Sequence, residues 1–401
     1  MRKRASARCS GPNWTSIFTR RLWSYRERTG LWTTNGCGAS SSPCPDRFTL
    51  GPTRSSATSS LSACSVCRGD DAVYFEFTSD QTELRDGLRD LLTDACPSDV
   101  VRAAWSDGRG PVPQLWKQLG AVGLLGLLAP ASRGGLDGTE IDLVFLLEEC
   151  GRHAVPGPLG EHLAVAVPAL VAADASECDQ AISGDCVVTV ADRSTDQLRW
   201  AATSDLVIHQ TDDGLALSDA ADMTILASCP SVDHSIASAA VTLGASRALP
   251  GADPTLAEHR AALAASAQLL GLADRMIAMA TEHVTVRRQF GVPVGSQQAV
   301  KHLLASALVA LEHARPVVYR AAWVLASAAG EPDLAVSFAK VYAGRAADVA
   351  ARAALQCHGA IGYSWEHDLH LWMKRAWALS AAWGTTAQHQ ARVAAAVLDE
   401  A

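Results

Sequence analysis

The sequence predicts a mainly α-helical protein with a small β domain, made of an N-terminal helical domain, a short middle β-sheet domain and a C-terminal four-helix bundle. Three observations predict it. Apolar residues recur at helical spacing early in the chain, short β-branched runs separated by Asp, Gly and Ser fill about 182–246, and helical spacing returns after Asp253. The expected parts are an extension at 1–72, a helical domain at 73–180, a β domain at 181–250 and a bundle at 251–401.

Residues 1–72 differ in composition from the rest of the 401-residue chain. They hold 11 of the 34 Lys and Arg residues but only 4 of the 42 Asp and Glu residues, and they show no hydrophobic periodicity. No apolar segment typical of a secretory signal is present. A zinc module would need a second well-spaced cysteine pair beside "CSVC" (Cys64 and Cys67), and Cys37 and Cys44 do not have that spacing. We expect 1–72 to be a disordered or spurious extension.

The remaining residues are acidic, since the whole chain carries a formal net charge of −8 and its first part is basic. An acidic body argues against nucleic acid as a partner. The longest uncharged apolar run, "LAVAVPALVAA" at 163–173, is too short to span a membrane. The six cysteines from Cys96 onward are scattered, which is typical of a reducing cytoplasm. The composition therefore indicates a cytoplasmic protein without a membrane span.

The N-terminal helices are predicted by their caps and apolar faces. Thr78 and Gln81 have capping-box spacing before a leucine face, and "SDVVRAAW" and "PQLWKQLGAVGLL" suggest two further helices. A glycine loop, "PASRGGLDGTE", precedes the helix "EIDLVFLLEECGRH", which we expect to end at Gly151. In the middle, "DCVVTVAD", "SDLVIHQ", "GLALSD", "DMTILAS" and "SAAVTL" are predicted strands of a small sheet or partial barrel.

The C-terminal helices begin at Asp253, an N-cap residue followed by proline at the first helical position. We expect that helix to run to about Arg288. A second helix, capped by Ser296, should reach about Ala329 with a kink at Pro316. Three further amphipathic segments follow it, "EPDLAVSFAKVYAGRAADVAARAALQCHG", "DLHLWMKRAWALSAAW" and "TTAQHQARVAAAVLDE".

The stretch "RRQFGVPVGSQQAVKH" at 287–302 links the first two bundle helices and carries polar, turn-forming residues. Arginine forms bidentate bonds with phosphate, and a helix N-terminus favours an anion. Arg287 and Arg288, with Gln297 and Gln298 on the next helix, could therefore clamp a diphosphate. The alternative is an ordinary helix hairpin, in which an arginine only interacts with the helix dipole.

Taken with "QCHGAIGYSWEHDLH" at 356–370, this stretch resembles the acyl-CoA dehydrogenase family, and "WEHDLHL" is similar to a bacterial subgroup of acyl-CoA and steroid side-chain degradation. The resemblance covers 75–400 in domain order and is specific in the C-terminal part. It implies FAD bound across a subunit interface. The residues that it assigns to FAD are Arg287, Phe290, Gln298, Gln356, Gly359, Ala360 and Thr385.

Within that set, the resemblance places Arg287 on the diphosphate, Phe290 beside the cofactor and Gln298 at the adenosine half. Gln356 and Gly359 would line the diphosphate from the neighbouring subunit. Ala360 stands where the family usually has a second glycine.

The resemblance also implies α,β-desaturation of an acyl thioester, in which a carboxylate removes the α-proton and a hydride passes to the flavin. The family places this base before a Gly-Thr pair near the C-terminus or early in the first bundle helix. These positions hold Trp383 and Ala261 here, and neither can accept a proton. Glu258, one turn before Ala261, is the nearest alternative. The middle region is also about half the usual extent and lacks the family's "TEP.AGSD"-type segment.

Three hypotheses follow from these losses. The chain is the base-lacking half of a heteromer with a second acyl-CoA dehydrogenase-like chain (α2β2), or a homomeric dehydrogenase or oxidase with a relocated base, or a flavin-free scaffold. The resemblance implies an acyl-CoA substrate and an electron-transfer flavoprotein as acceptor. We predict no metal site: adjacent residues of the five Glu-His dipeptides point about 100° apart on a helix, and His367 with His370 reads as solvated or capping.

Overall fold

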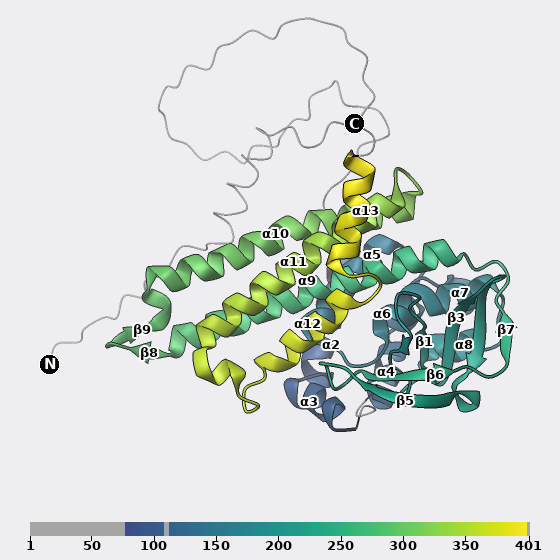
Figure 1. Cartoon of the computed structure of the whole chain (residues 1–401), viewed down its shortest axis with the longest axis horizontal. Coiled ribbons are helices and arrows are strands. Elements are labelled where there is room, and N and C mark those ends of the chain that lie inside the picture. Colours follow the sequence, from purple (N-terminus) through teal and green to yellow (C-terminus); the bar gives the residue numbers. More distant parts are fainter. Residues whose placement is uncertain (1–76, 108–111, 399–401) are drawn as a thin grey trace, which may run out of the picture. The chain divides into compact units, whose positions relative to one another are not determined.

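The computed structural model describes residues 77–107 and 112–398, which belong to one compact unit, Tyr74–Ala401. It contains helices at the N-terminal side, two small sheets and a bundle of long helices (Figure 1). The mainly α-helical fold with a small β region is thereby confirmed. The expected extension at 1–72 lies outside the described residues, and the domain limits near 180 and 250 remain predictions.

The N-terminal helices are built as their caps predict. The main ones are α2 (Ser79–Ala95), α3 (Ser98–Asp107), α4 (Val112–Ala121) and α5 (Glu140–Arg152). The capping box of Thr78 and Gln81 opens α2. After α5 the chain continues through α6 (Leu159–Glu161), a π-helical turn η3 (His162–Ala166), α7 (Val167–Ala172) and α8 (Cys178–Ser183).

Gly151 does not end α5, as the sequence suggested; the helix continues to Arg152, and His153 is its C-cap. The glycine serves helix packing instead. A Cβ at Gly151 would lie 2.2 Å from the carbonyl oxygen of Gln268, and one at Gly271 would lie 1.8 Å from that of Glu148. Both contacts are impossible for a side chain, so the two glycines allow α5 to pack directly against the backbone of the first bundle helix.

All five predicted strand segments form strands, but in two sheets. A four-stranded sheet has the order β1-β3-β4-β7 and a three-stranded sheet the order β2-β6-β5. The strands are β1 (Val188–Val190), β2 (Gln197–Leu198), β3 (Leu206–Thr211), β4 (Gly214–Asp219), β5 (Thr224–Pro230), β6 (Ala237–Thr242) and β7 (Ser246–Ala248). β1 pairs with β3 in parallel, and every other pair in these sheets is antiparallel.

The bundle is formed by α9 (Pro254–Val286), α10 (Gln298–Ser327), α11 (Pro332–His358) and α12 (Leu369–Ala381), and α13 (Thr386–Leu398) packs on α11. Asp253 caps α9 as predicted. The helix α9 runs through the core between α5 and the other bundle helices (Figure 1). It is long and apolar enough to cross a membrane, but 83% of its most apolar window is buried inside the protein, as in a core helix.

Two details of α10 differ from the sequence expectation. Ser296 does not cap the helix: it lies in the short 3-10 helix η5 (Val294–Ser296), and its hydroxyl donates to the carbonyl of Pro293. The N-cap is Gln297, whose extended backbone precedes Gln298 as the first helical residue. Pro316 lies inside α10, and the helix continues through it to Ser327.

Candidate active site

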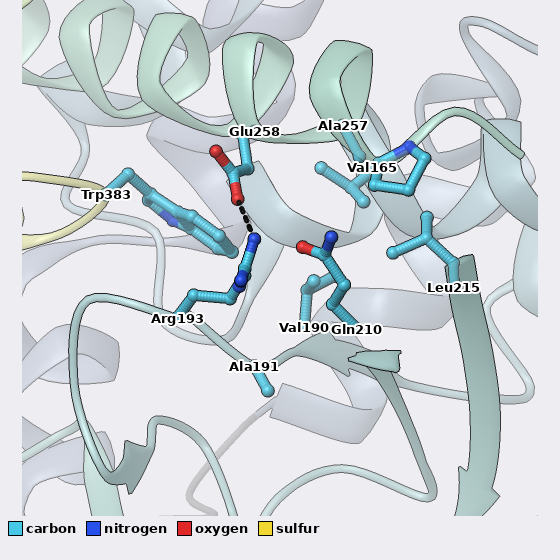
Figure 2. Close-up of a pocket in the computed structure, with 10 residues that line it drawn as sticks. Val165, Val190, Ala191, Arg193, Gln210, Leu215, Ala257, Glu258 and Trp383 are labelled. Atoms are coloured by element: carbon cyan, nitrogen blue, oxygen red, sulfur yellow. Dashed lines mark ion pairs between the residues drawn. The ribbon is translucent and has the colours of Figure 1, made fainter. Parts of the chain in front are cut away.

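Two groups of residues from the sequence analysis occupy different places. The first surrounds Trp383, in a pocket between α9 and the β region (Figure 2). We call it the Trp383 pocket; its lining residues are Val165, Val190, Ala191, Arg193, Gln210, Leu215, Pro254, Ala257, Glu258 and Trp383. The second group lies at the far end of the bundle.

The Trp383 pocket is almost filled. Its cavity volume is about 20 Å³, which is room for a single water molecule, whereas pockets for drug-sized ligands usually measure ~300–1,000 Å³. The indole of Trp383 lies across the pocket opposite Glu258 and Arg193 (Figure 2). The residues present therefore do not fit a flavin ring or an acyl thioester at this place.

Trp383 is held in a strained loop between α12 and α13. Its backbone has φ +56°, followed by Gly384 at φ +90°, and such a conformation costs a tryptophan on the order of 1–3 kcal/mol. Its N–H donates to the carboxylate of Asp192 at 2.7 Å, and its carbonyl accepts from Nε2 of His389 at 3.0 Å. The guanidinium of Arg199 lies 5.4 Å from its ring centroid.

The carboxylate candidates do not supply a positioned base. Ala261 is buried in the core, one turn after Ala257 on α9. Glu258 does face the pocket, but it forms an ion pair with Arg193 at 3.7 Å. An ion pair with Arg193 stabilises the charged carboxylate and occupies it, which weakens it as a proton acceptor.

The second group, which we call the bundle end, consists of Arg287, Phe290, Gln298, Gln356, Gly359 and Ala360. All six are exposed. The hairpin of β8 (Arg288–Gln289) and β9 (Val292–Pro293) and the start of α10 lie at the same end of the bundle as the end of α11 (Figure 1). The predicted FAD residues other than Thr385 are thus brought to one end of the molecule.

The bundle end has features that fit a nucleotide. Arg287 follows α9, and it forms no ion pair among the residues described in the structure. Gly359 has φ 64° and ψ −140°, a conformation open almost only to glycine, and nothing lies within 4 Å of where its Cβ would be. The backbone there is therefore accessible to a ligand. Arginine and an accessible backbone are typical of diphosphate sites.

Phe290 is the most exposed large apolar side chain in the part of the chain that the structure describes, at 97%. With Gly291 it forms the two-residue turn between β8 and β9, and both have positive φ, 53° and 82°. This is the type I′ pattern, which favours Asn-Gly over Phe-Gly. A strained, exposed phenylalanine indicates a contact with another molecule.

Thr385 lies apart from the bundle end, on the loop that carries Trp383. Its hydroxyl donates to Oε1 of Gln388 at 2.9 Å and accepts from the N–H of Gln388 at 3.3 Å. These bonds form the N-terminal cap of α13. In this chain the Gly-Thr pair therefore has a structural role that needs no cofactor.

The sequence analysis missed two features. A cavity of about 250 Å³ between α2, α5, α9 and α10 is lined by charged groups that pair with each other, such as Arg315 with Glu148 at 2.7 Å. At the bundle end, His367 lies with His283 and His358 rather than forming a metal pair with His370. No spacing rule finds this cluster, because its members come from three separate elements.

The comparisons with known proteins agree with this architecture. Residues 78–177 match the model of the acyl-CoA dehydrogenase N-terminal domain, and residues 252–398 match that of the acyl-CoA dehydrogenase C-terminal domain. The chain is 32% identical over 313 residues to the acyl-CoA dehydrogenase IpdE2 of Mycobacterium tuberculosis, covering 73% of this chain and 89% of that protein. This chain therefore belongs to the acyl-CoA dehydrogenase family, whose members are oxidoreductases with FAD as cofactor.

Solved structures support the same fold. The ChsE4-ChsE5 complex from Mycobacterium tuberculosis matches with a TM-score of 0.73 and 22% identity, over 82% of this chain and 100% of the matched chain. The Tcur3481-Tcur3483 steroid dehydrogenase variant matches with a TM-score of 0.70 and 24% identity, over 80% and 98%. PigA with FAD and proline matches with a TM-score of 0.71 and 16% identity, over 82% and 100%.

Proposed function

We propose that this chain is the base-lacking subunit of a heteromeric acyl-CoA dehydrogenase that carries out FAD-dependent α,β-desaturation of an acyl-CoA thioester. A second acyl-CoA dehydrogenase-like chain would bring the carboxylate base and the contacts to the flavin ring, in an α2β2 assembly. The observation that carries the proposal is Trp383, which stands at the position of the base and fills the pocket.

The division of labour follows from the two places described above. The bundle end would hold the diphosphate and adenosine half of FAD, with Arg287 neutralising phosphate charge and Gly359 offering its backbone. FAD, when bound, supplies the acceptor for two electrons. The Trp383 pocket of this chain would exclude both substrate and water. Two structures of similar fold have two-chain names, ChsE4-ChsE5 and Tcur3481-Tcur3483, which favours a heteromer.

The name of the second structure includes a steroid dehydrogenase, and the resemblance of "WEHDLHL" points the same way, so we propose steroid or fatty acyl side-chain catabolism in the cytoplasm. An electron-transfer flavoprotein would reoxidise the complex. The proposal is tested by assaying acyl-CoA dehydrogenation with an artificial electron acceptor, first with this chain alone and then with the dehydrogenase-like chain encoded beside it.

We expect negligible activity from this chain alone, activity on mixing, and fewer flavins than chains in the complex. Trp383→Glu restores a carboxylate before Gly384 and should give at most a trace of activity, because the rest of the pocket remains filled. Rapid flavin reduction by a saturated acyl-CoA in the unmixed chain would refute the proposal.

The rival is a homomeric dehydrogenase that uses Glu258, whose carboxylate faces the pocket (Figure 2). Glu258→Gln discriminates the two: it abolishes activity if Glu258 is the base and leaves the activity of the mixed complex unchanged if the partner supplies it.

A further inference from the structure

Three histidine side chains converge at the bundle end. His283 lies in the last turn of α9, His358 is the last residue of α11, and His367 precedes α12. One ring nitrogen from each lies within 4.8 Å of the other two. The ring centroids of His358 are 4.5 Å from those of both His283 and His367. The cluster thus joins three elements that are far apart in the sequence.

His358 is oriented as a metal ligand would be. Its Nδ1 lies 2.7 Å from the carbonyl oxygen of Ala354. A carbonyl can only accept, so Nδ1 carries the proton and Nε2 presents a lone pair. That Nε2 is buried and has no hydrogen-bond partner, and the residue is 6% exposed. Histidines that bind metal usually donate their other N–H to a backbone carbonyl in this way.

The cluster is also in the right charge state. Burial is the main cause that lowers the pKa of His283, His358 and His367, and the mutual repulsion of the rings adds to it. Arg287 acts in the same direction on His283, while the carboxylate of Asp368 opposes the shift at His367. Neutral imidazoles at pH 7 are the form that a metal ion needs.

Only small movements separate the cluster from a coordination site. If all three nitrogens stood at the 4.8 Å limit, an ion between them would lie about 2.8 Å from each, against ~2.0–2.1 Å for a zinc–imidazole bond. Nδ1 of His367 accepts from the N–H of Leu369 at 3.1 Å. Binding through Nε2 would move the proton to Nδ1 and break that bond. The ring precedes α12 rather than lying within it, and the freed N–H at the helix start can bond to water.

We propose that His283, His358 and His367 bind one divalent transition-metal ion of the zinc type. Three imidazoles without a carboxylate suit zinc, copper or nickel and not magnesium or calcium. With three protein ligands, a fourth position stays open to water or an external ligand. The ion would tie the ends of α9 and α11 to the segment before α12, next in sequence to Gly359 and one turn from Arg287.

The experiment uses the full chain, purified without a polyhistidine tag and stripped with EDTA. Zn²⁺ is titrated against a chromophoric chelator, and Co²⁺ absorption reports the ligand type. We expect one tightly bound ion per chain and a cobalt spectrum without thiolate charge-transfer bands. His283→Gln and His367→Gln should each weaken Zn²⁺ binding at least ~100-fold, because even the loss of an outer-shell partner costs 10–100-fold.

His313→Gln is the matched control, because His313 is exposed on α10 away from the cluster, and it should leave the affinity unchanged. Circular dichroism and melting temperature verify that each variant folds; His283 and His367 are partly exposed, so their glutamine variants are expected to do so. Absence of stoichiometric binding, equal affinity in the cluster variants and the control, or a thiolate-type cobalt spectrum would each overturn the proposal. None of these readouts depends on flavin or on dehydrogenase activity, so the result is independent of the proposed function.

Discussion

The Trp383 pocket and the bundle end have opposite characters, although the family resemblance assigns both to one cofactor site. The pocket is closed by a large side chain that buried partners hold in place. The bundle end is exposed, keeps an arginine that pairs with no carboxylate among the described residues, and carries a strained phenylalanine. The difference teaches that a chain can lose the reacting half of a site while it keeps the half that serves a neighbouring subunit.

The largest expected effect concerns the closed side. Arg375 is 3% exposed and bonds to the buried carboxylate of Asp233, to the carbonyl of Val155 at 2.8 Å and to the hydroxyl of Ser235 at 2.7 Å. Arg375→Met leaves the Asp233 charge uncompensated and should lower the free energy of unfolding by ~3–5 kcal/mol, measured by urea denaturation. Arg352→Met, which removes an exposed pair with Asp348, should leave the midpoint unchanged. Equal effects in both variants would contradict this account of the closed side.

Acid should weaken the same side through His162. Its Nε2 donates to the carbonyl of Ala181 and its Nδ1 accepts from the N–H of Val188 in β1. Burial lowers the pKa of His162 to about 4, from a model value of 6.5. A lowered folded-state pKa means that stability is fully present above pH 6.5 and is lost as the pH falls toward 4. The loss is on the order of 3 kcal/mol.

The measurement is urea denaturation between pH 7 and pH 4. His162→Gln, which can keep one donor and one acceptor, should remove this part of the pH dependence. If wild type and variant lose stability in parallel, His162 is not its source.

At the bundle end, Arg287→Ala should weaken FAD retention in the assembled protein at least tenfold, because a hydrogen bond to a charged group contributes about 1.5–3 kcal/mol. Flavin content after gel filtration measures it. Arg288→Ala is the matched control, since the neighbouring residue is also exposed but has no role in the resemblance. Equal flavin loss in both variants would return the segment to an ordinary helix end.

The smallest effect separates the Phe290 ring from its backbone. Phe290→Asn places Asn-Gly in a type I′ turn and should stabilise the chain by up to ~1 kcal/mol, while it weakens binding of FAD or of the partner chain. Phe290→Ala removes the ring but keeps a side chain at positive φ, so it should weaken binding without the gain in stability. Thermal unfolding together with flavin content distinguishes the two. Unchanged binding in both variants would mean that the exposed ring has no partner.

The sequence predicted much of the fold because burial within one element is a local property. Apolar periodicity located α9, α10 and α11, β-branched runs located β1 and β3 to β6, and Asp253 marked a helix start correctly. The prediction was wrong where a residue has two possible local roles. Gly151 packs against α9 instead of ending α5, and Ser296 lies before the N-cap of α10.

By itself the sequence determined the family, the order of the elements and the absence of a carboxylate at Trp383 and Ala261. Only the tertiary structure decided that Trp383 fills a pocket anchored by Asp192, and that His283, His358 and His367 meet. The physical reason is that helix crossing and loop conformation set distances between residues far apart along the chain. No periodicity or spacing within one segment encodes those distances.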